Sequence, residues 1–471
     1  MIEHVFGYQF ASVDDDALVA TIADCARAEA DLAAKRLAAS AELTARYTEP
    51  DGQREYFAVD GWRLAVAEIA AAMRINENAA SREMCIAMAL RGRLPRVAAL
   101  FAAGQLNPGL VATLTWRTRL IVDPRILAEI DSDIAERVTD WGALSVSKLE
   151  KKIDALVDEL DPDARVRTRT AVRNQDVRFG KPDDEAGTTW VTALMLTTDA
   201  ELLKRRVTEM SGRVCEGDPR TAGQRRTAAL GALAAHADGL TCQCGRQDCP
   251  AAGVDSRASS IVINVIAQQD SQTAEPKKSP TMAFLLDGSV IPTPLLAELM
   301  RNGAKVQRVQ KPDATPDTGY RPTAKTARFV RMRDMTCRFP GCDRPAEFCD
   351  IDHTTPYPAG ATHASNNKCL CREHHLLKTF GGWRDEQLPD GTVIWTSPLG
   401  RTYCTRPTSR LFYPDWDTTT APLPPATRSD VCENNGLKMP RRRRTRDQDR
   451  LARIRREREL NARDRAARPP P

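Results

Sequence analysis

The spacing of apolar residues predicts that the chain begins with helices. Over residues 15–150, Ala, Leu, Arg and Glu dominate, and apolar positions recur every three to four residues in segments such as LAAKRLAASAEL and WRLAVAEIAAAM. This spacing gathers the apolar side chains on one face of a helix. We therefore expect residues 1–150 to form an α-helical module.

The pattern changes after this module. WVTALMLTT (190–198) and SIVINVIAQ (260–268) are short runs rich in Val, Ile and Thr, residues that favour strands. Between them, Asp199 is suited to cap a helix over the sequence AELLKRRVTEM. Residues 151–310 are therefore predicted to continue the module as mixed α/β structure. The Pro, Gly, Asp and Thr residues of KPDATPDTGYRP predict a linker at 311–327.

Length and composition predict a soluble protein of several domains. The chain has 471 residues, of which 42% are hydrophobic and 28% are charged. No run approaches the roughly 18 consecutive apolar residues of a membrane span, and the first residues lack the pattern of a secretory signal. Thirteen cysteines, partly gathered in pairs, fit a reducing compartment better than a disulfide framework. We expect a cytoplasmic protein with no membrane partner.

Positive charge is concentrated near the end of the sequence. The net charge is +5, yet residues 438–468 contain fourteen Lys/Arg and only five Asp/Glu. Residues 416–471, which start with a Pro/Thr-rich segment, are predicted to be a linker and a basic tail, disordered or helical. Two interpretations remain open: an arm that binds nucleic acid through Arg441, Arg442, Arg443 and Arg444, or a solvated extension.

A smaller cysteine cluster lies in the sequence TCQCGRQDC. It contains Cys242, Cys244 and Cys249, and His236 is a possible fourth ligand for a metal. A Cys-x-Cys pair on a tight loop can hold a structural zinc ion. The usual Cys-x₂-Cys spacing is absent, so reduced thiols without a metal are the alternative interpretation.

The densest chemistry lies further on, where four of the six histidines fall within residues 353–375. Cys337 and Cys342 flank Arg-Phe-Pro-Gly, whose Pro-Gly turn lets the two thiolates converge. Cys371 and His374 form a Cys-x₂-His pair at the start of a predicted helix. Together they predict a closed Cys₃His site for structural Zn²⁺, which would supply much of the folding energy of a small unit. The neighbouring cysteines, which could compete as ligands, are interpreted as buried strand residues: Cys349 and Cys369.

A second set of polar residues remains, and it suits phosphodiester hydrolysis, which needs a base, a water and a cation. Asp352 and His353 are adjacent, so on a strand they point to opposite faces, and one can bind metal while the other acts on the water. Imidazole suits the base because its ordinary pKa lies near working pH. His374 and His375 diverge by about 100° on a helix, so one can bind zinc while the other faces the catalytic cation. Asn366 completes the set.

The segments DIDHTTPYPAG and SNNKCLCREHH resemble the His-Asn-His (HNH) endonuclease motif in its zinc-bound ββα-metal form. The resemblance implies that Asp352 and His375 bind a catalytic divalent ion, Mg²⁺ or Mn²⁺, and that His353 is the general base. Asn366 would pin the loop that orients the histidine-bearing strand. The implied fold places Asp352 and His353 on a β-hairpin and His375 on the helix packed against it.

A wider stretch supports this resemblance. RPTAKTARFVRMRDMTCRFPGCDRPAEFCDIDHTTPYP and PDGTVIWTSPLGRTY resemble the C-terminal half of an actinobacterial, chiefly mycobacterial, repetitive-element family, the thirteen-E-twelve repeat proteins. In that family a helical module of unknown function precedes the HNH unit, which predicts an HNH domain at 328–415 here. The predicted function is metal-dependent cleavage of DNA.

Two other classes of function are weighed against the nuclease. One is a zinc-stabilised DNA-binding protein whose HNH unit is inert, but such a protein has no use for Asp352, His353 and His375. The other is a Cys/His hydrolase, which is disfavoured because thiolates held by zinc are poor free nucleophiles. The presence of the second set therefore favours the endonuclease.

Overall fold

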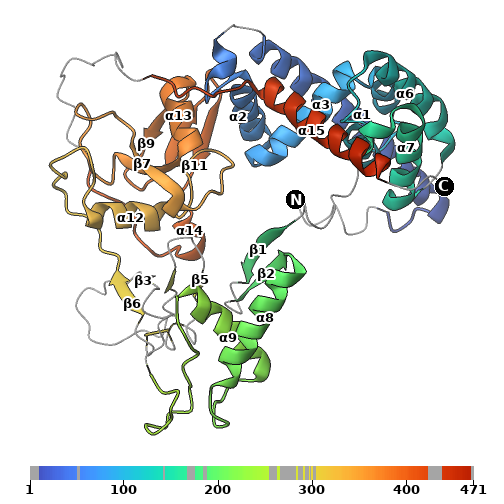
Figure 1. The fold of residues 1–471 in the computed structure, drawn as a ribbon. Helices are drawn as coiled ribbons and strands as arrows, with labels where there is room; N and C mark the ends of the chain where they lie inside the picture. Colours follow the sequence, from blue (N-terminus) through green and yellow to red (C-terminus); the bar gives the residue numbers. More distant parts are fainter. Residues whose placement is uncertain are drawn as a thin grey trace. The chain divides into compact units, whose positions relative to one another are not determined.

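The computed structural model describes residues 10–49, 53–141, 144–166, 175–183, 188–253, 304–422 and 438–467, with short stretches at 262–265, 283–284, 290–291, 296 and 299–300. The chain divides into two compact units. The first unit combines Met1–Thr168 with Gly436–Pro471, and the second is Arg169–Asn435. Figure 1 shows the elements of both units coloured along the sequence.

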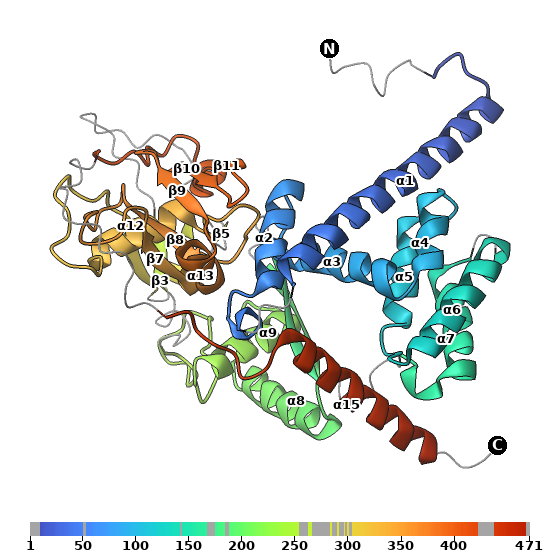
Figure 2. The same cartoon turned by 90° about the horizontal axis from the view of Figure 1, so that it is seen from above.

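The first unit is built from helices, most of which start at a residue whose side chain caps the helix. Asp14, Asp60, Asn76 and Asn107 accept backbone hydrogen bonds at four of the helix starts. Most of α1 before Ala30 is exposed, and this half extends away from the other helices (Figure 2). The elements in this part of the unit are α1 (Asp15–Tyr47), η1 (Arg54–Tyr56), α2 (Gly61–Met73), α3 (Glu77–Gly92), α4 (Pro95–Ala102), α5 (Pro108–Arg117), α6 (Pro124–Arg137), η2 (Val138–Trp141), α7 (Val146–Leu160) and η3 (Pro162–Ala164).

Helix α15 (Arg446–Ala466) completes the first unit and is formed by the basic tail. Ile454 joins the hydrophobic core of the N-terminal helices. Arg458 makes a two-pronged ion pair with Asp161, at 2.7 and 3.1 Å. Asn461 donates to two backbone carbonyls at the end of η3, each at 2.8 Å. Within the predicted tail, Arg446–Ala466 is therefore helical, which was one of the two expected states, and one face of this helix packs on the first unit through these anchors.

The second unit begins with a hairpin and two helices. Strands β1 (Asp176–Asp183) and β2 (Thr188–Leu194) pair antiparallel, and α8 (Thr197–Gly212) contacts α9 (Ala222–Ala234). Asp199 lies in the first turn of α8 and not at its cap as predicted, because the helix begins two residues earlier. A carboxylate there still complements the helix dipole.

A four-stranded sheet comes next in the order β5-β4-β3-β6, in which only β3 and β6 pair in parallel. Strand β3 of this sheet and the hairpin strand β2 overlap the two predicted strand runs, and the rest of the run 260–268 lies outside the described residues. The strands of this sheet are β3 (Val262–Val265), β4 (Ala283–Phe284), β5 (Val290–Ile291) and β6 (Lys305–Arg308).

The C-terminal part of the second unit holds the residues with candidate chemistry. Strand β7 pairs antiparallel with β8, α13 comes directly after β8, and a second sheet has the order β11-β10-β9. Figure 2 labels these elements. Phe339, Trp383 and Trp395 contact one another edge to face in the core. The elements are α12 (Ala324–Asp334), η5 (Ala346–Phe348), β7 (Cys349–His353), β8 (Asn367–Cys371), α13 (Arg372–Phe380), β9 (Arg384–Gln387), β10 (Val393–Thr396), β11 (Thr402–Thr405) and α14 (Ser409–Phe412).

A buried ion pair ties α12 to strand β8. The Asp334 carboxylate accepts from Arg333 Nε at 2.8 Å and from the backbone N–H of Cys369 at 2.8 Å. Arg333 also donates to the carbonyl oxygen of Asn367 at 2.8 Å. Both side chains are fully buried, so the charges depend on each other and on these backbone partners. The network fixes β8 at the residues that carry the site.

The coarse architecture predicted from the sequence is confirmed: the N-terminal region is mainly helical and small sheets lie in the C-terminal part. The predicted division at 1–150, 151–310, 311–327, 328–415 and 416–471 stays a prediction beside the two units. Among the described residues no helix has the length and apolar character needed to cross a membrane.

The segment predicted as a linker makes specific contacts within the second unit. Lys311 Nζ pairs with Asp417 at 2.8 Å, and the backbone N–H of Asp317 donates to the carbonyl oxygen of Thr362 at 2.9 Å. Thr362 also contacts His353 through its hydroxyl. The segment therefore reaches the candidate site.

Candidate metal centre and active site

The four predicted zinc ligands come together. One ligand atom from each of Cys337, Cys342, Cys371 and His374 lies within 4.8 Å of the other three. The Nδ1 atom of His374 is 3.4 Å from Cys337 Sγ and 3.1 Å from Cys371 Sγ. With metal–sulfur bonds of about 2.3 Å, one tetrahedral ion fits such a group. The Cys and His residues can thus hold a metal such as zinc.

Local structure explains the convergence. Gly341 has a φ of 74°, and the N–H of Cys342 donates to the carbonyl oxygen of Phe339 at 3.1 Å, which folds the first pair back on itself. The Phe339 ring stacks on His374 with centroids 4.0 Å apart. The strand cysteines do not join the group: Cys349 and Cys369 are buried on β7 and β8.

Asp352 and His375 also meet, although they come from β7 and α13. Asp352 Oδ1 lies 3.4 Å from His375 Nε2. The other ring nitrogen, Nδ1, is 2.9 Å from Asp350 Oδ2. Because a carboxylate oxygen accepts hydrogen bonds, we assign the ring proton to Nδ1, which leaves the lone pair of Nε2 facing Asp352. A carboxylate behind a histidine is the usual support of a metal ligand.

Asp352 belongs to a buried quartet of two carboxylates and two ammonium groups. Lys368 Nζ lies 2.9 Å from Asp352 and 2.5 Å from Asp385, and Lys378 Nζ lies 2.6 and 3.1 Å from the same two residues. Burial alone would raise the pKa of Asp352, but Lys368 and Lys378 bring that pKa down to about 2. Asp352 is therefore ionised at neutral pH and available as a ligand through Oδ1.

His353, at the end of β7, is held by a hydroxyl and an aromatic ring. Its Nε2 is 2.9 Å from Thr362 Oγ1, and that hydroxyl donates its proton to the carbonyl oxygen of Gly319 at 2.6 Å. We therefore assign the ring proton to Nε2, which leaves Nδ1 as the acceptor. The Tyr320 ring stacks on His353 at 5.2 Å. Burial lowers the pKa of His353, and Lys368 adds to this, against the opposing charge of Asp352.

Asn366 pins the loop between β7 and β8. Its Oδ1 accepts from the N–H of Thr355 at 2.8 Å, and its Nδ2 donates to the carbonyl oxygens of Thr355 and Ala361, each at 2.9 Å. The adjacent Asn367 is also fully buried, but neither its Oδ1 nor its Nδ2 has a hydrogen-bond partner among the described residues. Asn366, and not Asn367, is therefore the residue whose side chain fixes the loop.

Sequence reasoning missed several residues of the site. Lys378 lies one turn after His375 on α13, and Asp350 lies two residues before Asp352 on β7. Spacing alone could therefore have placed Lys378 on the helix face of His375 and Asp350 on the strand face of Asp352. Lys368 required the strand register, in which it opposes Asp352. Two more residues come from separate segments and have no local signal: Thr362 and Asp385.

The four predicted nucleic-acid-binding arginines belong to the first unit. Arg441 lies over the Tyr56 ring, with its guanidinium carbon 5.9 Å from the centroid. Arg442 pairs with Asp60 at 3.1 Å. Arg443 and Arg444 are exposed. The group is thus divided between two side chains with partners in the helical unit and two that face solvent.

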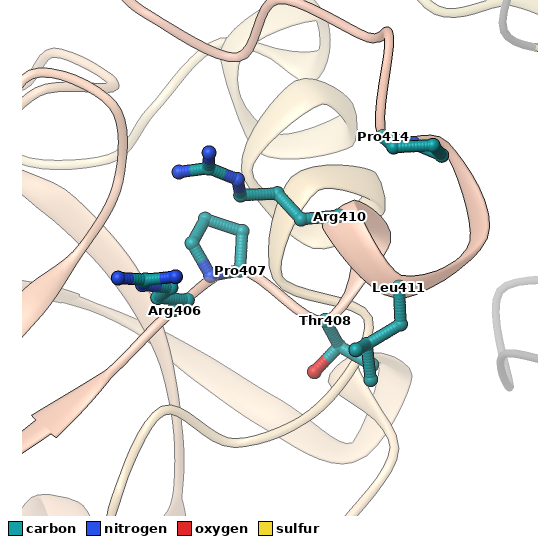
Figure 3. Close-up of a pocket in the computed structure, with 6 residues that line it drawn as sticks. All are labelled: Arg406, Pro407, Thr408, Arg410, Leu411 and Pro414. Carbon is teal, nitrogen blue, oxygen red and sulfur yellow. The ribbon is translucent and has the colours of Figure 1, made fainter. Parts of the chain in front are cut away.

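A separate open pocket of about 340 Å³ lies beside α14 and is drawn in Figure 3. Arg406 and Arg410 give it positive charge, and Arg410 is paired with Asp390 at 3.0 Å. None of the predicted metal or catalytic residues lines it. Its lining residues are Arg406, Pro407, Thr408, Arg410, Leu411 and Pro414.

Comparison with known proteins places the chain in a family. The family model described as a domain of unknown function, DUF222, matches residues 24–334, which end just before Cys337. The uncharacterized protein Rv3776 of Mycobacterium tuberculosis is 51% identical, over 96% of this chain and 91% of its own length. The uncharacterized protein Rv2100 of the same species is 50% identical, over 95% and 88%. No solved structure matches. The chain therefore belongs to the DUF222 family and has close mycobacterial relatives.

Proposed function

We propose that this protein is a metal-dependent DNA endonuclease that hydrolyses phosphodiester bonds through a ββα-metal site of the HNH type. The hairpin of β7 and β8 followed by α13 has the element order expected of that site. One observation carries the proposal. Asp352 Oδ1 and His375 Nε2 lie 3.4 Å apart, with the acceptor nitrogen of His353 on the residue next to Asp352.

The donor atoms suit a divalent cation. An ionised oxygen and an imidazole lone pair at 3.4 Å repel each other unless a positive charge or a proton lies between them. Carboxylate oxygen and imidazole are accepted ligands of Mn²⁺, and carboxylate oxygen also of Mg²⁺. Such a cation, when bound, supplies charge stabilisation to the phosphate and the departing oxygen. Asp350 keeps the Nε2 lone pair of His375 aimed at that position.

The residues of the chain perform the proton chemistry. His353 accepts the proton of the attacking water at Nδ1, because Thr362 holds the ring through Nε2 at 2.9 Å. Its lowered pKa keeps the imidazole neutral, and so able to accept, at neutral pH. Asn366 fixes the loop after His353 through three hydrogen bonds. Lys368 and Lys378 keep Asp352 ionised.

In the same proposal, Cys337, Cys342, Cys371 and His374 hold a structural Zn²⁺. These four residues would supply all four ligands of a tetrahedral ion, and such a site would leave no position for substrate. Cys371 ends β8 and His374 lies in the first turn of α13. The ion would therefore fix the angle between the strand and the helix that carries His375.

DNA binding is proposed to involve the exposed arginines around α15, beginning with Arg443 and Arg444. Substituting both by Gln is the suitable test, because removal of α15 would also take Ile454 and Arg458 out of the helical unit. We expect the double variant to bind DNA more weakly and with a flatter dependence on salt.

The proposal is tested with supercoiled plasmid and the purified full-length protein. We expect nicking in Mg²⁺ or Mn²⁺ and none in excess EDTA. The His375→Ala variant should need far more metal than the parent to reach the same cleavage rate. His236 is exposed and lies just after α9, so the His236→Ala variant should behave as the parent. Cleavage that persists unchanged in His375→Ala would refute the proposed metal site.

The second candidate is a zinc-stabilised DNA-binding protein with an inert HNH unit. The buried quartet favours it, because Lys368 and Lys378 already neutralise Asp352 and the unit can fold without a catalytic cation. The plasmid experiment separates the two functions. Tight, salt-sensitive DNA binding without nicking in any divalent metal would establish the second candidate in place of the first.

A further inference from the structure

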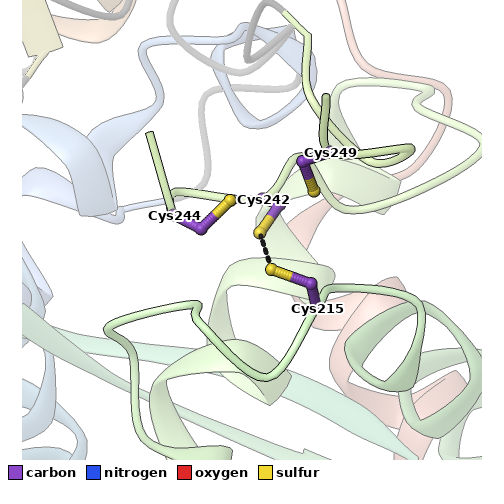
Figure 4. Close-up of side chains that lie close together, drawn as sticks. All are labelled: Cys215, Cys242, Cys244 and Cys249. Atoms are coloured by element: carbon purple, nitrogen blue, oxygen red, sulfur yellow. Dashed lines mark hydrogen bonds between the residues drawn. The ribbon is translucent and has the colours of Figure 1, made fainter. Parts of the chain in front are cut away.

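A second cysteine cluster lies in the other part of the second unit. The Sγ atoms of Cys215, Cys242, Cys244 and Cys249 all lie within 4.8 Å of one another. Figure 4 shows the four side chains gathered together. Cys215 comes after α8, and the other three lie on the loop after α9. The sequence offered the exposed His236 as a fourth ligand, but the fold brings Cys215 to the three cysteines instead.

The spacing of the sulfur atoms matches a metal site and not a pair of disulfides. The Sγ atoms of Cys215 and Cys242 are 3.5 Å apart, whereas a disulfide bond is about 2.05 Å long. Four thiolates at about 2.3 Å from one zinc ion lie about 3.8 Å from each other. The cluster is therefore close to the size that a tetrahedral ion requires.

Hydrogen bonds outside the cluster join the loop after α8 to the loop after α9. The Asp218 carboxylate accepts from Arg220 Nε at 2.9 Å and from the backbone N–H of Gln243 at 3.0 Å. Arg220 in turn donates to the carbonyl oxygen of Thr241 at 2.7 Å. Gly245, with a φ of 74°, lets the chain turn directly after Cys244. The cysteines are thus positioned by a second layer of bonds, as metal ligands commonly are.

The surrounding core is small. Among the described residues it comprises nine buried side chains from α8, α9 and their loops, two of which are Cys242 and Cys249 themselves. A core of this size gains much of its stability from a cross-link such as a disulfide or a metal. All four cysteines are free, so a metal is the remaining cross-link.

We propose that Cys215, Cys242, Cys244 and Cys249 bind one structural Zn²⁺ ion as a closed Cys₄ site. Four protein thiolates complete the tetrahedron, so the ion cross-links the loop after α8 to the loop after α9 and leaves no position for a substrate. This site is independent of the proposed nuclease activity. It accounts for four cysteines that the HNH unit does not use.

Zinc counting on the full-length protein tests the proposal. Reduced wild-type protein, dialysed against metal-free buffer, should hold one more zinc ion per chain than Cys215→Ser. The matched variant His236→Ala should hold as many zinc ions as the wild type. Equal zinc content in Cys215→Ser and the wild type would overturn the Cys₄ site, as would loss of one zinc in His236→Ala.

A conservative variant keeps the test valid if Cys215→Ser fails to fold. Cys215→His replaces one thiolate by imidazole and should retain the full zinc content. After exchange of zinc for Co²⁺, the thiolate-to-cobalt absorption of Cys215→His should fall by the contribution of one thiolate. An unchanged cobalt spectrum in this variant would show that Cys215 is not a ligand and would overturn the proposal.

Discussion

The two sets of polar side chains, which meet at the adjacent His374 and His375 of α13, differ in their access to solvent. In the Cys₃His set, Cys337, Cys371 and His374 are at most 5% exposed, and protein atoms fill all four ligand positions. In the other set, Asp352 and His353 are also buried, at 8% and 5%, but the side chain of His375 is 22% exposed and Tyr320, which stacks on His353, is 59% exposed. Adjacent residues of one helix thus belong to a closed set and an open set. The closed set is suited to stability and the open set to chemistry.

Removing one ligand of the Cys₃His set should have the largest effect on stability. Cys371→Ser should lose one zinc ion and abolish the cooperative unfolding of the C-terminal part of the second unit. The physical reason is that zinc binding by such sites supplies about 10–16 kcal/mol, which exceeds the stability of a typical domain. Zinc analysis and calorimetry measure both effects. The exposed Cys404→Ser is the matched control and should change neither.

Breaking the buried quartet should have the next largest effect. Lys368→Met leaves Asp352 and Asp385 buried with one ammonium group between them. Removing one partner of a buried ion pair costs about 3–5 kcal/mol, which denaturant unfolding can measure. The control is Lys325→Met, whose exposed pair with Asp313 should contribute at most about 1 kcal/mol. Equal losses in both variants would contradict the role given to the quartet.

The role of Asp350 as the partner of His375 can be tested by a substitution that leaves the fold intact. Asp350→Asn removes the charge behind His375, so the metal concentration for half-maximal cleavage should rise about 10–100-fold. The rate at saturating metal should change little, because His353 is untouched. Metal titrations of plasmid cleavage measure this, with the exposed Asp343→Asn as control. An unchanged titration curve would mean that Asp350 does not support a metal ligand.

The smallest expected effect distinguishes two neighbouring asparagines. Asn367→Leu removes a buried amide that has no partner among the described residues, so the free energy of unfolding should rise by about 1 kcal/mol. Asn366→Leu should have the opposite sign, because three hydrogen bonds to the loop are lost. Thermal unfolding compares the two. Destabilisation by Asn367→Leu would contradict the assignment of Asn366 as the loop-fixing residue.

Local patterns were sufficient to predict part of this molecule. Helical spacing predicted the N-terminal helices, and short cysteine and histidine spacings predicted the Cys₃His group. Contacts between distant segments could not be predicted in the same way. Cys215 reaches Cys242 across 27 residues, and Arg458 reaches Asp161 across 297. Such contacts depend on the packing of whole elements, which no single stretch of sequence encodes.

The basic tail illustrates this difference. Its charge density suggested a segment outside the folded units, because fourteen Lys/Arg mask the few apolar residues. Ile454 and Asn461 are buried nonetheless, on the same face of α15 as Arg458. Ile454, Arg458 and Asn461 are spaced three to four residues apart, which is the spacing of one helix face. The residues they contact lie in the first 168 residues of the chain. Only the fold identifies them.

We propose His353 as the general base of a DNA endonuclease, and single-turnover cleavage with imidazole rescue measures that role without interference from later steps. His353→Ala should cut about 10²–10⁴-fold more slowly than the parent, with unchanged zinc content, and added imidazole should restore part of the rate. His236→Ala should cut at the parent rate and should not respond to imidazole. If His353→Ala cuts as fast as the parent, His353 is not the general base.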